Sequence, residues 1–150
     1  MRIRRALAAD LPAMQSVSAR AYDEYERRLG YTPPAATEDC GDWIRRGAAW
    51  VGESDSEVMA VLLVAPEGNA LRVHSAVVDP VWQGEGHGTA LLDHAAALAK
   101  DAGLAEVHLY TNAKMDRNIA MYAHCGFALA GHRPHPVHGG HLLADMVRVV

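Results

Sequence analysis

The chain has 150 residues, half of them apolar and about a fifth charged, a composition typical of one soluble globular domain spanning 1–150. Its 14 Lys and Arg are outnumbered by 18 Asp and Glu, which argues against a nucleic-acid or acidic-membrane binder. The longest apolar run, 58–65, is too short to cross a bilayer, and the cationic start lacks the apolar segment of a secretory signal. Cys40 and Cys125 have no metal or redox spacing, so we expect reduced thiols in the cytoplasm.

The N-terminal third predicts an edge strand and two helices. The strand covers 2–7. Asp10 is the expected N-cap of a long helix, with Pro12 in its first turn and Gly30 at its end. After a stiff loop that contains two prolines, Thr37 is expected to cap a short second helix.

The middle of the chain predicts strands. Three short β-like runs are separated by polar or glycine-containing turns and indicate an antiparallel meander: 48–53, 58–65 and 70–78. A helix then ends at Gly103, and a strand at 104–111 follows, so this strand–helix–strand order indicates a parallel crossover. A short helix over 115–126 and a hairpin made of 127–131 and 141–150 complete an α+β chain.

Three glycines, Gly84, Gly86 and Gly88, lie within five positions between a strand and a helix. Backbone N–H groups in such a loop, together with the positive end of the helix, form a site for phosphate oxygens. A P-loop is excluded because no Gly-Lys-Ser/Thr ending follows. The dinucleotide fingerprint fails because Leu91 stands where its third glycine belongs, and an ordinary tight turn remains the alternative.

The loop sequence Val78-x-Pro80-x-x-Gln83-x-x-Gly86-x-Gly88 is similar to the acetyl-CoA pyrophosphate motif of the GNAT superfamily of N-acetyltransferases. The stretch NIAMYAHCGF at 118–127 resembles the family's second signature, an Asn, a Tyr four residues later and then Gly-Phe. The resemblance covers nearly the whole chain. It implies a mixed sheet of six to seven strands with about four flanking helices, and a parallel, splayed strand pair at the cofactor site.

The resemblance also implies an activity. Acetyl-CoA would be the co-substrate, and a primary amine of a small molecule or peptide would attack its thioester directly in a ternary complex. A homodimer is compatible with the family. Two alternatives stay open at this point: a non-catalytic module that binds or senses acyl-CoA, and a nucleotide-binding regulatory domain.

Site residues follow from matching the family's motifs to this chain. Tyr122 matches the position that commonly protonates the leaving thiolate, and a backbone N–H near Val78 would stabilise the oxyanion. His74 is the preferred base, because an imidazole has an ordinary pKa of about 6.5 and some relatives carry a histidine there. The expected cofactor-binding residues are Val77, Val78, Gln83, Gly84, Glu85, Gly86, His87, Gly88, Thr89, Asn112, Asn118 and Tyr122.

The acceptor pocket is expected at the first helix and the loop after it, with Tyr22, Tyr25 and Glu26 as contacts. Glu26 would attract a cationic amine. Arg72 is expected on the same strand face as His74, two residues earlier. Relatives often have a carboxylate or histidine at this position, so Arg72 suggests an anionic group on the acceptor.

Four histidines recur at every third residue near the end of the chain: His132, His135, His138 and His141. Neutral imidazoles bind zinc or nickel, so a metal site is one interpretation of this run. This spacing does not place four side chains on one strand face, and Pro134 and Pro136 exclude a helix. We therefore expect a hairpin loop that reaches towards the active site, and no metal.

Overall fold

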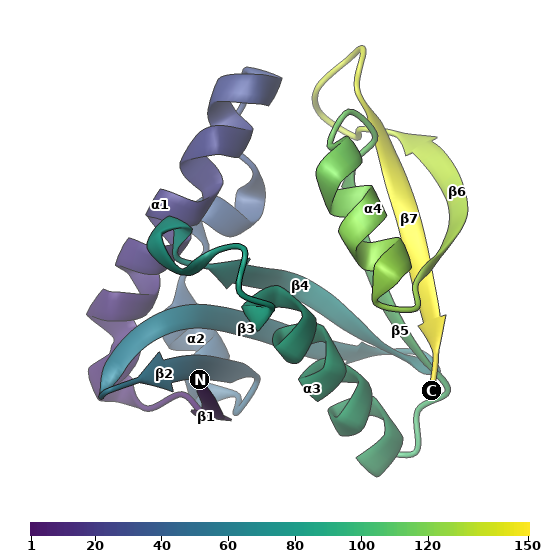
Figure 1. Ribbon diagram of the computed structural model, residues 1–150. Coiled ribbons are helices and arrows are strands. Elements are labelled where there is room, and N and C mark those ends of the chain that lie inside the picture. The colour runs from purple at the N-terminus through teal and green to yellow at the C-terminus, as the bar shows by residue number, and fades with distance from the viewer. The chain divides into compact units, whose positions relative to one another are not determined.

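The computed structural model describes all residues from Met1 to Val150 (Figure 1). The strands are β1 (Arg2–Arg5), β2 (Ala49–Ser54), β3 (Glu57–Glu67), β4 (Ala70–Val78), β5 (Glu106–Asn112), β6 (Ala128–Pro134) and β7 (Leu142–Val149). The α-helices are α1 (Leu11–Leu29), α2 (Cys40–Arg45), α3 (His87–Asp101) and α4 (Asp116–His124). Short 3-10 helices are η1 (Ala8–Asp10), η2 (Pro34–Thr37) and η3 (Pro80–Trp82).

The seven strands form one mixed sheet in the order β1-β2-β3-β4-β5-β7-β6, which confirms the predicted fold class. Strand β1 is at one edge, as its sequence predicted. The pairs β1–β2, β2–β3, β5–β7 and β6–β7 are antiparallel, and β4–β5 is parallel. The parallel ladder joins only Ala70–Arg72 to Glu106–His108, although β4 has nine residues and β5 has seven.

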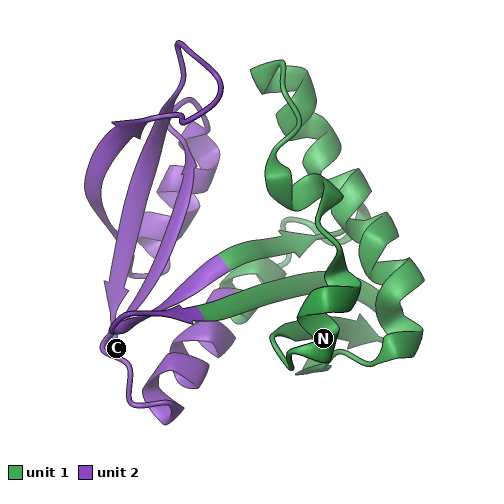
Figure 2. Ribbon diagram, turned by 180° about the vertical axis from the view of Figure 1, so that it is seen from behind, with its two compact units in different colours: residues 1–65, 74–91 green, residues 66–73, 92–150 purple.

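The chain is divided into two compact units (Figure 2). Unit 1 contains residues 1–65 and 74–91, and unit 2 contains residues 66–73 and 92–150. The chain passes from one unit to the other within β3, within β4 and within α3. No helix in the structure combines the length and the apolarity that a membrane crossing needs.

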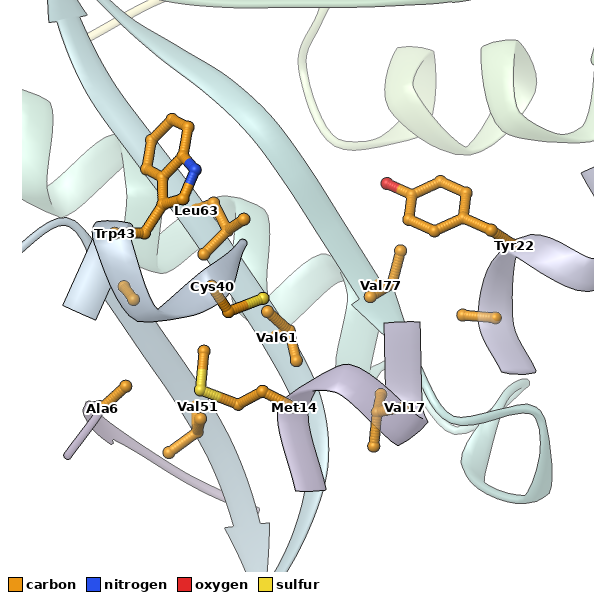
Figure 3. Packing of buried hydrophobic residues seen from close by; sticks show 12 residues of the cluster. Ala6, Met14, Val17, Tyr22, Cys40, Trp43, Val51, Val61, Leu63 and Val77 are labelled. Atoms are coloured by element: carbon orange, nitrogen blue, oxygen red, sulfur yellow. The ribbon is translucent and has the colours of Figure 1, made fainter. Parts of the chain in front are cut away.

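The core of unit 1 is made by the apolar stripe of α1, by α2 and by inward-facing strand residues (Figure 3). Met14 and Val17 of α1 are fully buried with Val51 and Val61. This burial explains the helical spacing of the α1 sequence, because apolar residues three and four apart share one face. Gly30 ends α1 in the left-handed conformation, with φ of 78°, as its position predicted.

One cap prediction is corrected, and the other is confirmed in position only. Thr37 does not cap the second helix: it ends η2, and Asp39 is the N-cap of α2, accepting from the Gly41 amide. Asp10 does stand at the N-cap position of α1, but its carboxylate makes no cap hydrogen bond there. It accepts instead from the Leu7 amide and from both terminal nitrogens of Arg4, so it anchors β1 to the start of the helix.

Unit 2 contains the final hairpin and the helix that precedes it. Strand β7 lies between β5 and β6, and its residues Leu143, Ala144 and Met146 are buried, as are Val107 and Leu109 of β5. Gly126 follows α4 with φ of 90°, and the buried Phe127 leads into β6. The strand β6 extends three residues beyond the predicted 127–131, so His132 belongs to a strand and not to the loop.

Candidate active site

The glycine loop lies in unit 1 and joins β4 to α3. Gly84 and Gly86 have φ of 85° and 83°, the left-handed region that other residues adopt only with strain. A Cβ built on either glycine would meet no atom of the chain within 4 Å, so the space beside the loop is open. The Ala90 amide donates to the Gly86 carbonyl, and the amides of His87 and Gly88 precede this first helical bond. This arrangement suits an anion at the helix start.

Asp79, directly after β4, fixes the entry to this loop. Its carboxylate accepts from Arg20 of α1 and from the Val81 amide, and its own amide donates to the Met59 carbonyl. The side chain is buried, and burial by itself would raise its pKa. The hydrogen bonds from Arg20 and Val81 outweigh burial and hold the pKa of Asp79 below its ordinary value.

Two polar side chains of the loop, those of Gln83 and Glu85, have defined contacts. Gln83 Nε2 donates to the Val78 carbonyl at 3.0 Å, so it ties the loop back to the strand that feeds it. Glu85 is exposed, and its Oε2 lies 3.5 Å from His87 Nε2. The carboxylate of Glu85 therefore remains solvated.

We expect the unfolding free energy to fall in acid because of Asp79 and Asp10, whose pKa values both lie below the ordinary value of about 3.9. A lowered folded-state pKa stabilises the fold above the unfolded pKa, and this stabilisation is lost as pH falls through the folded pKa. Urea unfolding between pH 2 and 7 will measure it. Asp79→Asn should lower the unfolding free energy by roughly 1–3 kcal/mol at pH 7. It should also make the fall of the unfolding free energy in acid (the acid limb) less steep. An equally steep acid limb in Asp79→Asn would contradict this assignment.

The predicted acceptor residues of unit 1 are partly core residues. Tyr22 is buried, its hydroxyl is hydrogen-bonded to that of Ser75 at 2.8 Å, and its ring meets that of Tyr25 edge-on with centroids 5.3 Å apart. Figure 3 shows Tyr22 extending from α1 near Val77 of β4. Tyr25 and Glu26 are half-buried. Their contact with an acceptor stays a prediction.

His74 lies on β4 beside two residues that the sequence did not connect with it. Its Nε2 is 2.9 Å from Glu38 Oε2, and its ring stacks on that of Trp43 with centroids 4.8 Å apart. Glu38 Oε1 accepts from Trp43 Nε1 at 2.8 Å. The sequence placed a histidine on this strand but gave no signal for a carboxylate 36 residues earlier.

Unit 2 holds four further predicted residues. Tyr122 and Asn118 are four residues apart on α4 and therefore share a helix face, and both are half-buried. Asn112, at the end of β5, is buried: its Nδ2 is 3.0 Å from His141 Nδ1, and its Oδ1 accepts from the Lys114 amide. Arg72 Nε lies 2.9 Å from Glu67 Oε2. The functional roles of these four stay predictions.

The histidine-rich hairpin is organised by its own hydrogen bonds. His135 Nδ1 accepts from the amides of Val137 and His138, and the His135 amide donates to the His141 carbonyl. Partial burial and the neighbouring His138, His141 and Arg133 lower the pKa of His135. No three His, Cys, Asp or Glu side chains are arranged to hold a metal ion.

Comparison with known proteins identifies the family. Residues 14–127 match the model of the acetyltransferase (GNAT) family, which is more than half of the chain. The chain belongs to the GNAT acetyltransferase family. The motif resemblance noted in the sequence is thereby confirmed.

Two curated relatives that the chain matches are both mycothiol acetyltransferases. That of Nocardiopsis dassonvillei is 34% identical over 87 residues, which are 58% of this chain and 23% of the relative. That of Beutenbergia cavernae is 27% identical over 123 residues, which are 79% of this chain and 41% of the relative. The chain thus spans less than half the length of the relatives it matches.

A solved structure supports the GNAT fold. The chain resembles PaiA N-acetyltransferase from Thermoplasma acidophilum, solved in complex with coenzyme A, with a TM-score of 0.82. The match covers 99% of this chain and 98% of that one at 16% sequence identity. At this identity the likeness shows the fold alone.

The state of the cysteines bears on whether this GNAT chain could form a covalent acyl-enzyme intermediate. Neither Cys40 nor Cys125 is in a disulfide. Burial, aided by the nearby Glu38 and Asp39, raises the pKa of the Cys40 thiol. A protonated, buried thiol is a poor nucleophile, so Cys40 does not suit a covalent acyl-enzyme route.

Proposed function

We propose that the chain is an acetyl-CoA-dependent N-acetyltransferase that acetylates a primary amine of a small molecule or peptide. The observation that carries this proposal is the open glycine loop between β4 and α3, in a chain that belongs to the GNAT family. The family match spans residues of both units, and the chain crosses between them inside three elements. We therefore propose that residues 1–150 act as one acetyltransferase domain.

The loop residues Gln83 to Thr89 would hold the diphosphate of the co-substrate. Their amides and the start of α3 supply the positive potential. Glu85 is compatible with a bound diphosphate, because its carboxylate is exposed to solvent and lies beside His87. Val77 and Val78 of β4, with Asn112 and Asn118, would line the pantetheine arm. Acetyl-CoA, when bound, supplies the acetyl group as a thioester.

Three tasks then fall to this chain's own groups. His74 takes a proton from the ammonium group of the acceptor, because a protonated amine has no lone pair for attack. A backbone N–H near Val78 donates to the carbonyl oxygen as negative charge develops there. Tyr122 gives its phenolic proton to the departing sulfur as the carbon–sulfur bond breaks and the carbon–nitrogen bond forms.

Acceptor selection is proposed for four residues: Tyr22, Tyr25, Glu26 and Arg72. Glu26 would attract the cationic amine, and Arg72, whose Nε is paired with Glu67 in the structure, would bind an anionic group. The names of the two curated relatives add mycothiol-related amines to the compounds worth testing. A cytoplasmic location and a homodimer remain predictions from the sequence.

Calorimetry followed by an amine screen tests the proposal. Acetyl-CoA should bind at least about tenfold more tightly than ATP or NAD, a difference of about 1.4 kcal/mol. A panel of amino acids, polyamines, aminoglycosides, N-terminal peptides and mycothiol-related amines should then give amine-dependent thiol release. Binding without turnover for any amine would favour the acyl-CoA-sensing alternative. Binding of ATP or NAD with no response to acetyl-CoA would refute both.

A further inference from the structure

Glu38, Trp43 and His74 form a closed triangle within unit 1. Glu38 lies in the short segment between η2 and α2, and one of its oxygens accepts from the indole N–H while the other meets His74 Nε2. The indole and imidazole rings stack at an interplanar angle of 21°. Each residue therefore contacts the other two, and both carboxylate oxygens are engaged.

The charge on Glu38 determines which nitrogen of His74 carries the proton. Burial raises the pKa of Glu38, but hydrogen bonds from Trp43 and His74 and the nearby Arg46 together hold it below its ordinary value. Glu38 is thus an ionised carboxylate at neutral pH and can only accept hydrogen bonds. His74 Nε2 must then carry a hydrogen, and in the neutral ring the lone pair lies on Nδ1.

We propose that Glu38 is a positioning residue that fixes the tautomer and orientation of His74, with Trp43 holding Glu38 in place. This inference rests on the proposed function, in which His74 is the base. The acceptor's proton passes to Nδ1, and the resulting imidazolium is faced by the Glu38 carboxylate until Nδ1 returns the proton to solvent. A base oriented by a third group follows the general logic of activated nucleophile systems.

Glu38→Gln is a sharp test because an amide has one acceptor oxygen, whereas the indole and the Nε2–H are both donors. If the amide oxygen of the new glutamine side chain still accepts from the indole N–H of Trp43, the NH2 group of the same amide faces His74 Nε2. The imidazole is then favoured with the lone pair on Nε2 and the proton on Nδ1, the tautomer that cannot take a proton at Nδ1. Glu38→Asp keeps the charge, and Trp43→Phe keeps the stacked ring but removes the indole N–H.

The first measurement is the tautomer of His74, read from imidazole nitrogen shifts in ¹⁵N-histidine-labelled protein. We expect Nε2–H in the wild type, Nδ1–H or a mixture in Glu38→Gln, and Nε2–H in Glu38→Asp. Glu106→Gln is the matched control, because it removes another carboxylate from a histidine, His108, at 3.3 Å. An unchanged His74 tautomer in Glu38→Gln would overturn the inference, and this readout is independent of turnover.

The second measurement is kcat/KM with the best amine of the screen, together with the separate KM for acetyl-CoA. Glu38→Gln should lower kcat/KM for the amine by roughly 10–100-fold and leave the KM for acetyl-CoA unchanged. Asp39, Cys40 and Arg46, the other ionisable groups near Glu38, are unchanged in every variant.

The outcomes separate this inference from the proposed function. A loss of rate in Glu38→Gln with an unchanged His74 tautomer indicates a structural role for Glu38 and contradicts positioning. Turnover in Glu38→Gln equal to that of the wild type and of Glu106→Gln also contradicts it, while the acetyltransferase proposal stands. No turnover in the wild type refutes the acetyltransferase proposal, and the tautomer measurement still decides whether Glu38 orients His74. If Glu38→Gln does not fold, Glu38→Asp should retain the wild-type tautomer and Trp43→Phe should shift it partly.

Discussion

Tyr122→Phe will lower kcat for amine acetylation by about a hundredfold, the usual contribution of a positioned acid. The substitution removes only the phenolic hydroxyl, the group proposed to protonate the departing sulfur. The ring remains, so its tilted contact with Phe127, at a centroid distance of 6.2 Å, should persist. The KM for acetyl-CoA should change little, because the hydroxyl acts when the carbon–sulfur bond breaks and not in binding. Steady-state thiol release with each substrate varied in turn will measure both constants.

Tyr110→Phe is the matched control for this prediction. Tyr110 is exposed on β5, and its ring lies under the guanidinium of Arg133 at 4.9 Å. Removal of its hydroxyl should leave kcat at the wild-type value. Wild-type turnover in Tyr122→Phe would show that the sulfur obtains its proton elsewhere. A large rise in the KM for acetyl-CoA with kcat unchanged would instead make Tyr122 a binding residue.

Features that depend on neighbouring residues could be predicted from the sequence. The α1 stripe, the Gly30 end and the glycine loop all follow from local spacing and from the conformational freedom of glycine. The turn between β2 and β3 is similar: Asp55 and Ser56 both adopt positive φ, as a two-residue hairpin turn requires. Such signals lie within a few residues of the feature they specify.

The cap of α2 shows where local signals become ambiguous. Thr37 and Asp39 are both good N-cap residues and stand two positions apart. The prolines before Thr37 favour a 3-10 turn that ends at Thr37, and the helix therefore starts after Asp39. Asp10 stands at the N-cap of α1, but its carboxylate is paired with Arg4, six residues away, and makes no cap hydrogen bond.

The contacts that define the site could not be predicted, because they join residues far apart in the chain. Glu38 and His74 are separated by 36 residues, Tyr22 and Ser75 by 53, and Arg20 and Asp79 by 59. Each pair is brought together when α1 and the segment around α2 pack against the sheet. A contact between residues so far apart leaves no periodic pattern in the sequence from which it could be predicted. Motif resemblance located His74, but only the folded chain shows the Glu38 carboxylate beside it.

Gly86→Ala will weaken acetyl-CoA binding by about tenfold or more, which corresponds to about 1.4 kcal/mol. Gly86 has φ of 83°, and an L-residue in this region is strained by roughly 1–2 kcal/mol. No atom of the chain lies within 4 Å of the added methyl, so a steric clash inside the protein does not explain a loss of affinity. The loss must come from amides that turn away from the diphosphate or from a methyl group in the space it needs. Calorimetry with acetyl-CoA will measure the affinity, and thermal unfolding will measure the strain.

Gly103→Ala separates strain from binding. Gly103 follows α3 with φ of 73° and has equally open surroundings, so alanine should lower its stability by a similar amount and leave acetyl-CoA affinity unchanged. S-acetylpantetheine, which lacks the diphosphate, then localises the effect. Gly86→Ala should bind this fragment as the wild type does, because the loop contacts only the missing group. Equal loss of affinity for the fragment and for acetyl-CoA would mean that the loop shapes the pantetheine channel, and wild-type affinity for acetyl-CoA would mean that the diphosphate binds elsewhere.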